Sequence, residues 1–214
     1  MIKKIFINQL NQTILINQAY ITIKFTDVEN YREFCYNLNN SIIYSVNNKE
    51  ENYSNILFIK DPIDIELNNK KIMIVLYKKL MKYINSNLQE HILLIENEIF
   101  KLFDELSYQT NYDLNYDGEI DINKILGMYQ LNLKENKNYN YLECLVNYIR
   151  LNVELNNYSL IISFGLIRVL TKKELELLKK ELQLLNISIV DIIIDINNNN
   201  KISYLNIDSE WNIF

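Results

Sequence analysis

The sequence predicts an α/β protein, with a head domain that contains a mixed, partly parallel sheet and flanking helices, and an inserted all-helical leg with one long helix. Three observations predict this class. Strand-length apolar runs occur at both ends of the chain, a strand–helix–strand pattern typical of parallel strands begins near residue 159, and the middle of the chain has apolar residues at helical spacing. We therefore expect residues 1–66 and 157–214 to form the head and residues 67–156 to form the leg.

The first 66 residues indicate strands around one short helix. Apolar and β-branched runs, separated by turns rich in Asn and Gln, predict strands over residues 5–7, 13–16, 19–25, 41–46 and 55–60. Thr26 and Glu29 have the spacing of a capping box, in which a hydroxyl and a carboxylate satisfy the free amides of a first helical turn. Apolar residues three and four apart then predict a helix from about Val28 to Asn39.

The middle of the chain is dominated by one apolar stripe. Apolar residues recur every three or four positions from Leu76 to Leu106 and predict a single helix over about residues 70–107, capped by Asn68 or Asn69. Such a helix would be roughly 55 Å long, which exceeds the side of a small globule. We expect it to project or to pair with a helix of another subunit.

The C-terminal part of the chain returns to strands. Amphipathic spacing predicts a helix over about residues 141–156, and an apolar strand follows over residues 159–167. A second capping box, Thr171 with Glu174, begins a leucine-striped helix that leads into a buried strand over residues 187–194. A last strand is expected over residues 202–207.

The composition favours a folded protein without a membrane segment. Hydrophobic residues make up 49% of the 214 positions, with 16 Tyr and 8 Phe, which excludes a disordered chain. No apolar run is long enough to cross a bilayer, and the N-terminus lacks the pattern of a signal peptide. The two cysteines, Cys35 and Cys144, lie in amphipathic patterns and favour free thiols. We expect a cytoplasmic protein.

A basic segment stands out against the acidic total of −5. Residues 67–89 contain five lysines and no acidic residue, and these are Lys70, Lys71, Lys78, Lys79 and Lys82. Spacings of seven and four place Lys71, Lys78 and Lys82 on one helix face, with Lys79 beside it. Such a face can neutralise phosphates, although a solvated helix face would have the same composition.

An acidic segment follows directly. Residues 90–121 contain nine acidic residues and one base, Lys101. Residues 113–121 resemble the first nine positions of an EF-hand calcium loop, but Lys124 stands where that loop has its bidentate glutamate. The pattern leaves two interpretations open: a less formal Ca²⁺ site that draws on the carboxylates, or an acidic surface loop. The candidate ligands are Asp113, Asp117, Glu119 and Asp121.

The sequence gives little support for catalysis. Its only histidine, His91, has no evident nucleophile to serve, and the three isolated glycines do not form a phosphate loop. Asp61, Asp64 and Glu66 faintly suggest a metal-dependent nuclease, but their alternation with apolar residues equally suits an ordinary strand. We therefore predict a protein that is not an enzyme. The alternatives are a nuclease and a structural coiled-coil scaffold that does not bind DNA.

Several segments resemble one family. Residues 63–72 (IDIELNNKKI), running into residues 76–80 (LYKKL), are similar to the signature of the Csn-two family, the accessory DNA-binding protein of type II-A CRISPR spacer acquisition. Weaker resemblances are found at residues 112–116 with 122–126, 164–166 with 170–175, 192–194 and 204–211. The chain departs from the family pattern at Gly165 and Asp195.

The resemblance implies a specific function. It implies a homotetrameric ring in the bacterial cytoplasm that is stabilised by Ca²⁺ and whose basic interior encircles double-stranded DNA without regard to sequence. It also implies work beside the CRISPR adaptation integrase and the RNA-guided effector nuclease, with no nuclease activity of its own. A ring would explain how an acidic chain binds DNA, because four copies of the lysine segment converge on one channel.

Overall fold

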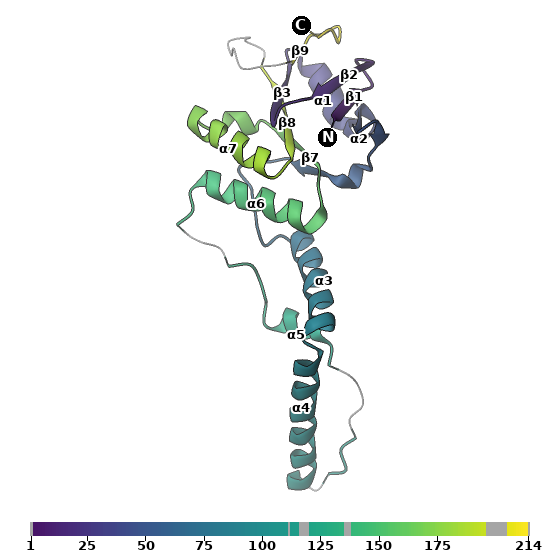
Figure 1. The fold of residues 1–214 in the computed structure, drawn as a ribbon, viewed down its shortest axis with the longest axis vertical. Helices are drawn as coiled ribbons and strands as arrows, with labels where there is room; N and C mark the ends of the chain where they lie inside the picture. The colour runs from purple at the N-terminus through teal and green to yellow at the C-terminus, as the bar shows by residue number, and fades with distance from the viewer. Residues whose placement is uncertain (1, 111, 116–119, 135–137, 196–204, 214) are drawn as a thin grey trace. The chain divides into compact units, whose positions relative to one another are not determined.

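The computed structural model describes residues 2–110, 112–115, 120–134, 138–195 and 205–213. The chain forms two compact units, a head unit of residues 1–66 and 136–214 and a leg unit of residues 67–135 (Figure 1). The predicted α/β class is confirmed, and the parallel and antiparallel strand pairs are divided between two sheets.

Five parallel strands form the central sheet of the head unit. Their order is β6-β7-β8-β3-β9, and every neighbouring pair is parallel. The strands are β3 (Tyr20–Phe25), β6 (Ile56–Ile59), β7 (Leu160–Phe164), β8 (Ser188–Ile194) and β9 (Leu205–Ile207). The predicted strand–helix–strand unit is confirmed, because β7 and β8 are adjacent and α7 (Lys172–Leu184) connects them. Of the predicted last strand, residues 202–204 lie outside the described residues.

The second sheet is antiparallel and has the order β2-β1-β4-β5. Its strands are β1 (Lys3–Ile7), β2 (Gln12–Ile16), β4 (Ile42–Val46) and β5 (Lys49–Glu50). Two short helices, α1 (Val28–Tyr36) and α2 (Leu38–Ser41), precede β4, and a 3-10 helix, η1 (Tyr53–Asn55), precedes β6. The sequence predicted neither β5 nor η1.

Side chains on the two faces of the parallel sheet build two separate cores. Val190 and Ile192 face the core that the sheet shares with the antiparallel sheet and α1, while Ile189 on the same strand faces the other core. That second core includes buried leucines of α7 and two fully buried residues of α6 (Tyr141–Asn156), Leu145 and Ile149. The alternation along β8 therefore explains why its sequence is apolar almost throughout, since both faces of the strand are buried.

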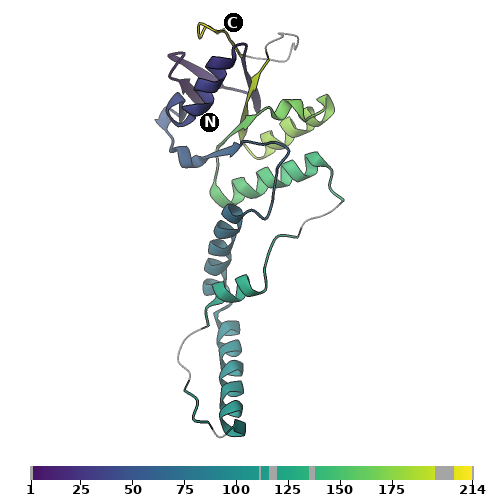
Figure 2. The same ribbon diagram turned by 180° about the vertical axis from the view of Figure 1, so that it is seen from behind.

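The α6 helix has the predicted bounds but belongs to the head unit and not to the leg. Its buried face packs into the core beside α7, and the two helices lie side by side in both views (Figures 1 and 2). The predicted boundary at residues 156 and 157 therefore differs from the observed boundary at residues 135 and 136. Periodicity identified the helix but could not show which apolar surface its stripe would cover.

Two local predictions for the head unit were wrong. The N-cap of α1 is Asp27, whose carboxylate accepts a hydrogen bond from the Asn30 amide at 2.9 Å, and not Thr26. The predicted strand over residues 159–167 ends at Phe164, because Gly165 adopts a left-handed conformation with φ of 76° and begins the 3-10 helix η2 (Leu166–Arg168). The second capping box is confirmed, since Thr171 and Glu174 exchange the expected hydrogen bonds.

The leg unit contains the long periodic segment, which forms two consecutive helices, α3 (Lys70–Asn87) and α4 (Gln89–Thr110). Leu88 lies between them with φ of −124° and ψ of 16°, so the predicted single helix is interrupted at one residue. The physical reason is local. Ser86 Oγ donates to the carbonyl of Lys82 and Asn87 Nδ2 to that of Tyr83, and such side-chain bonds compete with the helical ladder.

A short helix that the sequence did not predict, α5 (Ile122–Met128), lies beside α3. The Tyr77 hydroxyl of α3 donates to the carbonyl of Leu131 at 2.7 Å, and the side chain of Asn68 exchanges two hydrogen bonds with the backbone of Leu133. These contacts fasten the segment after α5 to the start of α3. Within the described part of the chain, no helix combines the length and hydropathy needed to cross a membrane.

Candidate nucleic-acid interface

The α3 helix begins in a way that concentrates positive charge. Asn69 is the N-cap, and its side chain accepts a hydrogen bond from the Ile72 amide at 3.1 Å. Lys70 and Lys71 then occupy the first turn, where no acidic residue is present. Cations are unfavourable there, because the free amides already give a helix N-terminus a partial positive charge, at a cost of about 0.3–1 kcal/mol each. Helix stability therefore does not explain why Lys70 and Lys71 occupy the first turn. Binding of a phosphate group at this helix N-terminus would explain both lysines.

The lysines of α3 are distributed as the sequence predicted. All five candidate residues, Lys70, Lys71, Lys78, Lys79 and Lys82, are exposed. At 100° per residue, Lys71, Lys78 and Lys82 fall within about 40° of one another and span about 17 Å along the axis. We call these three residues the lysine face. Tyr77, which holds the segment after α5, lies about 120° away around the helix, so the packing of the leg unit leaves the lysine face uncovered.

The lysine face has no counter-charge among the described residues of the leg unit. In the described part of the leg unit, the ion pairs are Lys101 with Glu98 and Lys124 with Asp121, and none involves the lysine face. The next helix, α4, has the opposite composition, with five acidic residues and one lysine. Charge therefore changes sign at Leu88. Unpaired ammonium groups on one face repel one another in the absence of a ligand, and a polyanion would relieve that repulsion.

Residues 113–121, which contain the predicted calcium ligands and which we call the acidic connector, are only partly described. Asp113 is exposed, whereas Asp117 and Glu119 lie outside the described residues. Asp121 is the N-cap of α5, with its carboxylate accepting a hydrogen bond from the Lys124 amide at 3.2 Å. The predicted calcium ligands are thus not brought together by the residues that the structure describes, and in those residues no group of three or more His, Cys, Asp or Glu is placed to hold a metal.

A comparison with protein-family models identifies the chain. The model of the CRISPR-associated protein (Cas_Csn2) family matches residues 35–209. This chain belongs to that family. The match includes the lysine face, the acidic connector and most of the parallel sheet. No curated protein sequence matches the chain.

The carboxylates that suggested a nuclease do not form a strand in this family member. Asp61, Asp64 and Glu66 follow β6 in a stretch without regular secondary structure, so the alternative of an ordinary strand was wrong. Asp61 accepts a hydrogen bond from the Ile63 amide at 2.9 Å, which is a turn contact. Over the described residues these three side chains do not form a candidate metal group.

Sequence reasoning missed a buried carboxylate in the head unit of this family member. Asp191 on β8 is fully buried and accepts four hydrogen bonds of 2.8–2.9 Å. The donors are the Tyr20 hydroxyl, Ser163 Oγ and the backbone amides of Leu166 and Ile167. Burial raises the pKa of Tyr20, and the charge of Asp191 adds to this effect. The lone acid within an apolar strand was the signal available in the sequence.

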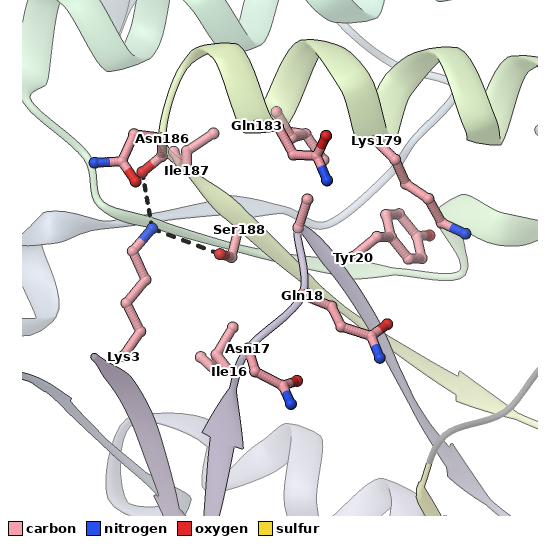
Figure 3. Close-up of a pocket in the computed structure, with 12 residues that line it drawn as sticks. Lys3, Ile16, Asn17, Gln18, Tyr20, Lys179, Gln183, Asn186, Ile187 and Ser188 are labelled. Atoms are coloured by element: carbon pink, nitrogen blue, oxygen red, sulfur yellow. Dashed lines mark hydrogen bonds between the residues drawn. The ribbon is translucent and has the colours of Figure 1, made fainter. Parts of the chain in front are cut away.

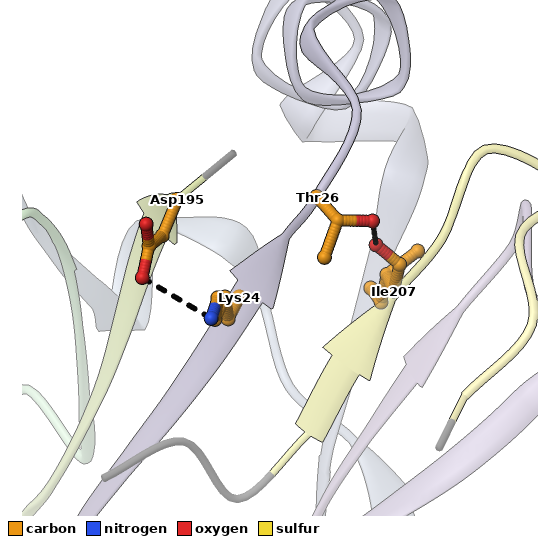
Figure 4. Close-up of polar contacts among 4 residues, drawn as sticks. All are labelled: Lys24, Thr26, Asp195 and Ile207. Atoms are coloured by element: carbon orange, nitrogen blue, oxygen red, sulfur yellow. Dashed lines mark hydrogen bonds and ion pairs between the residues drawn. The ribbon is translucent and has the colours of Figure 1, made fainter. Parts of the chain in front are cut away.

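The carboxyl end of the parallel sheet is where open α/β sheets usually bind ligands. In this protein the buried ammonium of Lys24 pairs with Asp195 at 3.1 Å between the ends of β3 and β8 (Figure 4). Beside it, the Thr26 hydroxyl donates to the carbonyl of Ile207 at 3.1 Å. These contacts join the ends of β3, β8 and β9 to one another.

Proposed function

We propose that this protein binds double-stranded DNA without reading its sequence, as a homotetrameric ring that assists CRISPR spacer acquisition in the bacterial cytoplasm. The observation that carries the proposal is the lysine face, an exposed basic surface with no ion pair to the described residues. Lysines bind phosphates as point charges and release the counter-ions of DNA, which gives affinity but no base discrimination. Family membership supports the CRISPR setting, with the adaptation integrase and the RNA-guided effector nuclease as proposed partners.

A ring accounts for an acidic protein that binds DNA. At a net charge of −5 a monomer would be repelled by DNA at long range, whereas four lysine faces around one channel would create a local positive field. The exposed apolar residues of α4 support self-assembly, since Ile95, Leu102 and Leu106, which share one helix face, are 47%, 53% and 41% exposed. Copies that pair through these residues would remove them from water.

We infer that Ca²⁺ stabilises the assembled ring. The support is the excess of acidic residues over residues 90–121, which would repel one another wherever copies meet. Oxygen ligands from carboxylates suit a hard cation, and Asp113, Asp117, Glu119 and Asp121 remain the proposed ligands. Because Asp121 also caps α5, we expect its contribution to be the smallest of the four.

We further propose that the protein is not an enzyme. Helix N-termini after parallel strands bind phosphate in nucleotide hydrolases, but here α1 begins with the carboxylates of Asp27 and Glu29. The α7 helix begins with a capping box that contains Glu174. Negative charge at both positions would repel a triphosphate. These features support the absence of nucleotide hydrolysis, while a metal-dependent nuclease and a scaffold without DNA affinity remain the alternatives.

The test is a charge reversal of the lysine face. Changing Lys71, Lys78 and Lys82 together to Glu should abolish retardation of linear duplex DNA, because attraction to the phosphates is replaced by repulsion. For any binding that remains, each lost phosphate contact should reduce the slope of log affinity against log salt concentration by about 0.9. The fold should persist, since exposed helix positions tolerate such changes. The DNA should remain full length in the presence of Mg²⁺ in all samples.

A matched control is available on α7. Lys172, Lys173 and Lys180 are also three exposed lysines on one helix, and their reversal gives the same change in net charge. This control should retain salt-sensitive binding. Equal losses in both triple variants would mean that net charge decides affinity, and undiminished binding after reversal of the lysine face would contradict the proposed interface.

A further inference from the structure

A pocket of about 430 Å³ lies in the head unit at the amino-terminal ends of β3 and β8 (Figure 3). The Lys24–Asp195 pair lies at the opposite, carboxyl-terminal ends of the same two strands. The side chains used in the argument come from β1, from the connection between β2 and β3, from α7 and from the start of β8. They are Lys3, Asn17, Gln18, Lys179, Gln183 and Ser188.

The inner end of the pocket holds a buried ammonium. Lys3 is 4% exposed, and its Nζ donates to the carbonyl of Asn186 at 2.9 Å and to Ser188 Oγ at 3.5 Å (Figure 3). Both acceptors are neutral, and Lys3 forms no ion pair with any residue that the structure describes. Burial accordingly lowers the pKa of Lys3. A lysine ammonium has three N–H donors, so one remains available.

The rim of the pocket adds uncommitted donors. The exposed side-chain amides of Asn17, Gln18 and Gln183 form no hydrogen bond to the described residues. Lys179 contributes a second ammonium, which Glu176 pairs with at 2.9 Å, and the described lining contains no acidic residue. The pocket therefore combines positive charge at its inner end with amide groups around its opening.

The pocket also lies near the C-terminal end of α7, where carbonyl groups would disfavour an anion. These carbonyls are already hydrogen-bonded. The amides of Leu185, Asn186 and Ile187 donate to the carbonyls of residues 181, 183 and 182 at 3.0–3.1 Å. The negative end of the helix is thus largely satisfied within the turn, which leaves Lys3 as the dominant charge facing the pocket.

We propose that this pocket binds a small organic anion, with a carboxylate or phosphate group on Lys3 and a polar body among the amides of Asn17, Gln18 and Gln183. The volume is within the range of about 300–1,000 Å³ that is usual for small-molecule sites. The anion would supply the counter-charge that Lys3 lacks. The proposed site lies wholly in the head unit and does not depend on DNA binding by the leg unit.

The test uses the full chain, with inorganic phosphate and citrate as separate probes in titration calorimetry. Saturable binding of either probe is expected, and the probe that binds identifies the preferred oxyanion. Lys3→Met should weaken it by about tenfold or more, because one charge-assisted hydrogen bond is lost. Lys4→Met is the matched control, since Lys4 lies on the same strand, its ammonium donates to Asn48 at 2.8 Å and to no other described residue, and it does not line the pocket.

A second readout needs no substitution. With ¹³C-labelled lysine, the bound probe should move the signal of the Lys3 side chain and leave that of Lys4 in place. An alternative role for Lys3 is purely structural, since its bonds join β1 of one sheet to β8 of the other. No saturable response to either probe, or equal affinities in the wild-type protein and Lys3→Met, would overturn the proposed site.

Discussion

Replacing Asp191 by asparagine should destabilise the head unit by about 3–5 kcal/mol. The substitution preserves the shape of the side chain but removes its charge and turns one oxygen into a hydrogen-bond donor. If the remaining oxygen keeps Ser163 and Leu166, the new amide faces the Ile167 N–H, whose hydrogen bond at 2.8 Å is lost. Tyr20 can reorient its hydroxyl to accept a hydrogen bond in place of donating one.

The magnitude follows from the four contacts. Hydrogen bonds to a charged group contribute about 1.5–3 kcal/mol each, and a buried donor without a partner costs about 1–3 kcal/mol. One contact of Asp191 is lost outright and the others lose their charge assistance. A total near 4 kcal/mol is a large part of the roughly 5–15 kcal/mol that stabilises a typical domain.

The assay is urea unfolding followed by tryptophan fluorescence. Trp211 is the only tryptophan in the chain, and its ring packs edge-on against Phe25 at a centroid distance of 6.0 Å, so its signal reports the head unit. Asp64→Asn is the matched control, because Asp64 is exposed, and its effect should stay within about 0.5 kcal/mol. A loss below about 1 kcal/mol for Asp191→Asn would refute the reasoning that four charge-assisted bonds hold this turn.

Three further predictions address the leg unit and the surface of the head unit. Chelation of Ca²⁺ should lower the molar mass of the assembly, more at low salt than at high salt, because salt screens the repulsion between carboxylates. The double variant Asp117→Ala with Glu119→Ala should not show this change in mass, and an unchanged response would place the ligands elsewhere. Tyr77→Phe should cost about 1 kcal/mol and speed amide exchange in the segment after α5, because the 2.7 Å hydrogen bond to Leu131 is lost, and unaltered exchange would argue against this contact. Capping-box hydrogen bonds lower the pKa of Glu174 from 4.5. The ionised carboxylate therefore stabilises the folded head unit fully above about pH 5, and this contribution is lost as pH falls through the lowered pKa. Glu174→Gln should lack this component of the pH profile, and identical profiles would contradict it.

Local pattern was sufficient for most elements of the fold. The spacing of apolar residues predicted α6 at its observed bounds and the helical character of residues 70–87, because helix periodicity depends on neighbours within one or two turns. The lysine face followed from the same spacing, and the structure leaves it exposed. The break at Leu88 was missed, although the polar residues 85–87 that precede it were visible in the sequence. A short polar run within an amphipathic helix usually faces solvent, so it did not indicate that these side chains would bond to the helix backbone.

The sequence by itself determined where most of the helices and strands lie and where charge is concentrated along them. Tertiary structure decided what those segments contact. It divided the strands between two sheets, assigned α6 to the head unit, and brought Tyr20, Ser163 and the turn after β7 to Asp191 from positions as far as 171 residues apart in the chain. The physical reason is that periodicity shows which face of an element is apolar, whereas the choice of partner for that face, and the burial of a lone carboxylate, depend on contacts between residues distant in sequence.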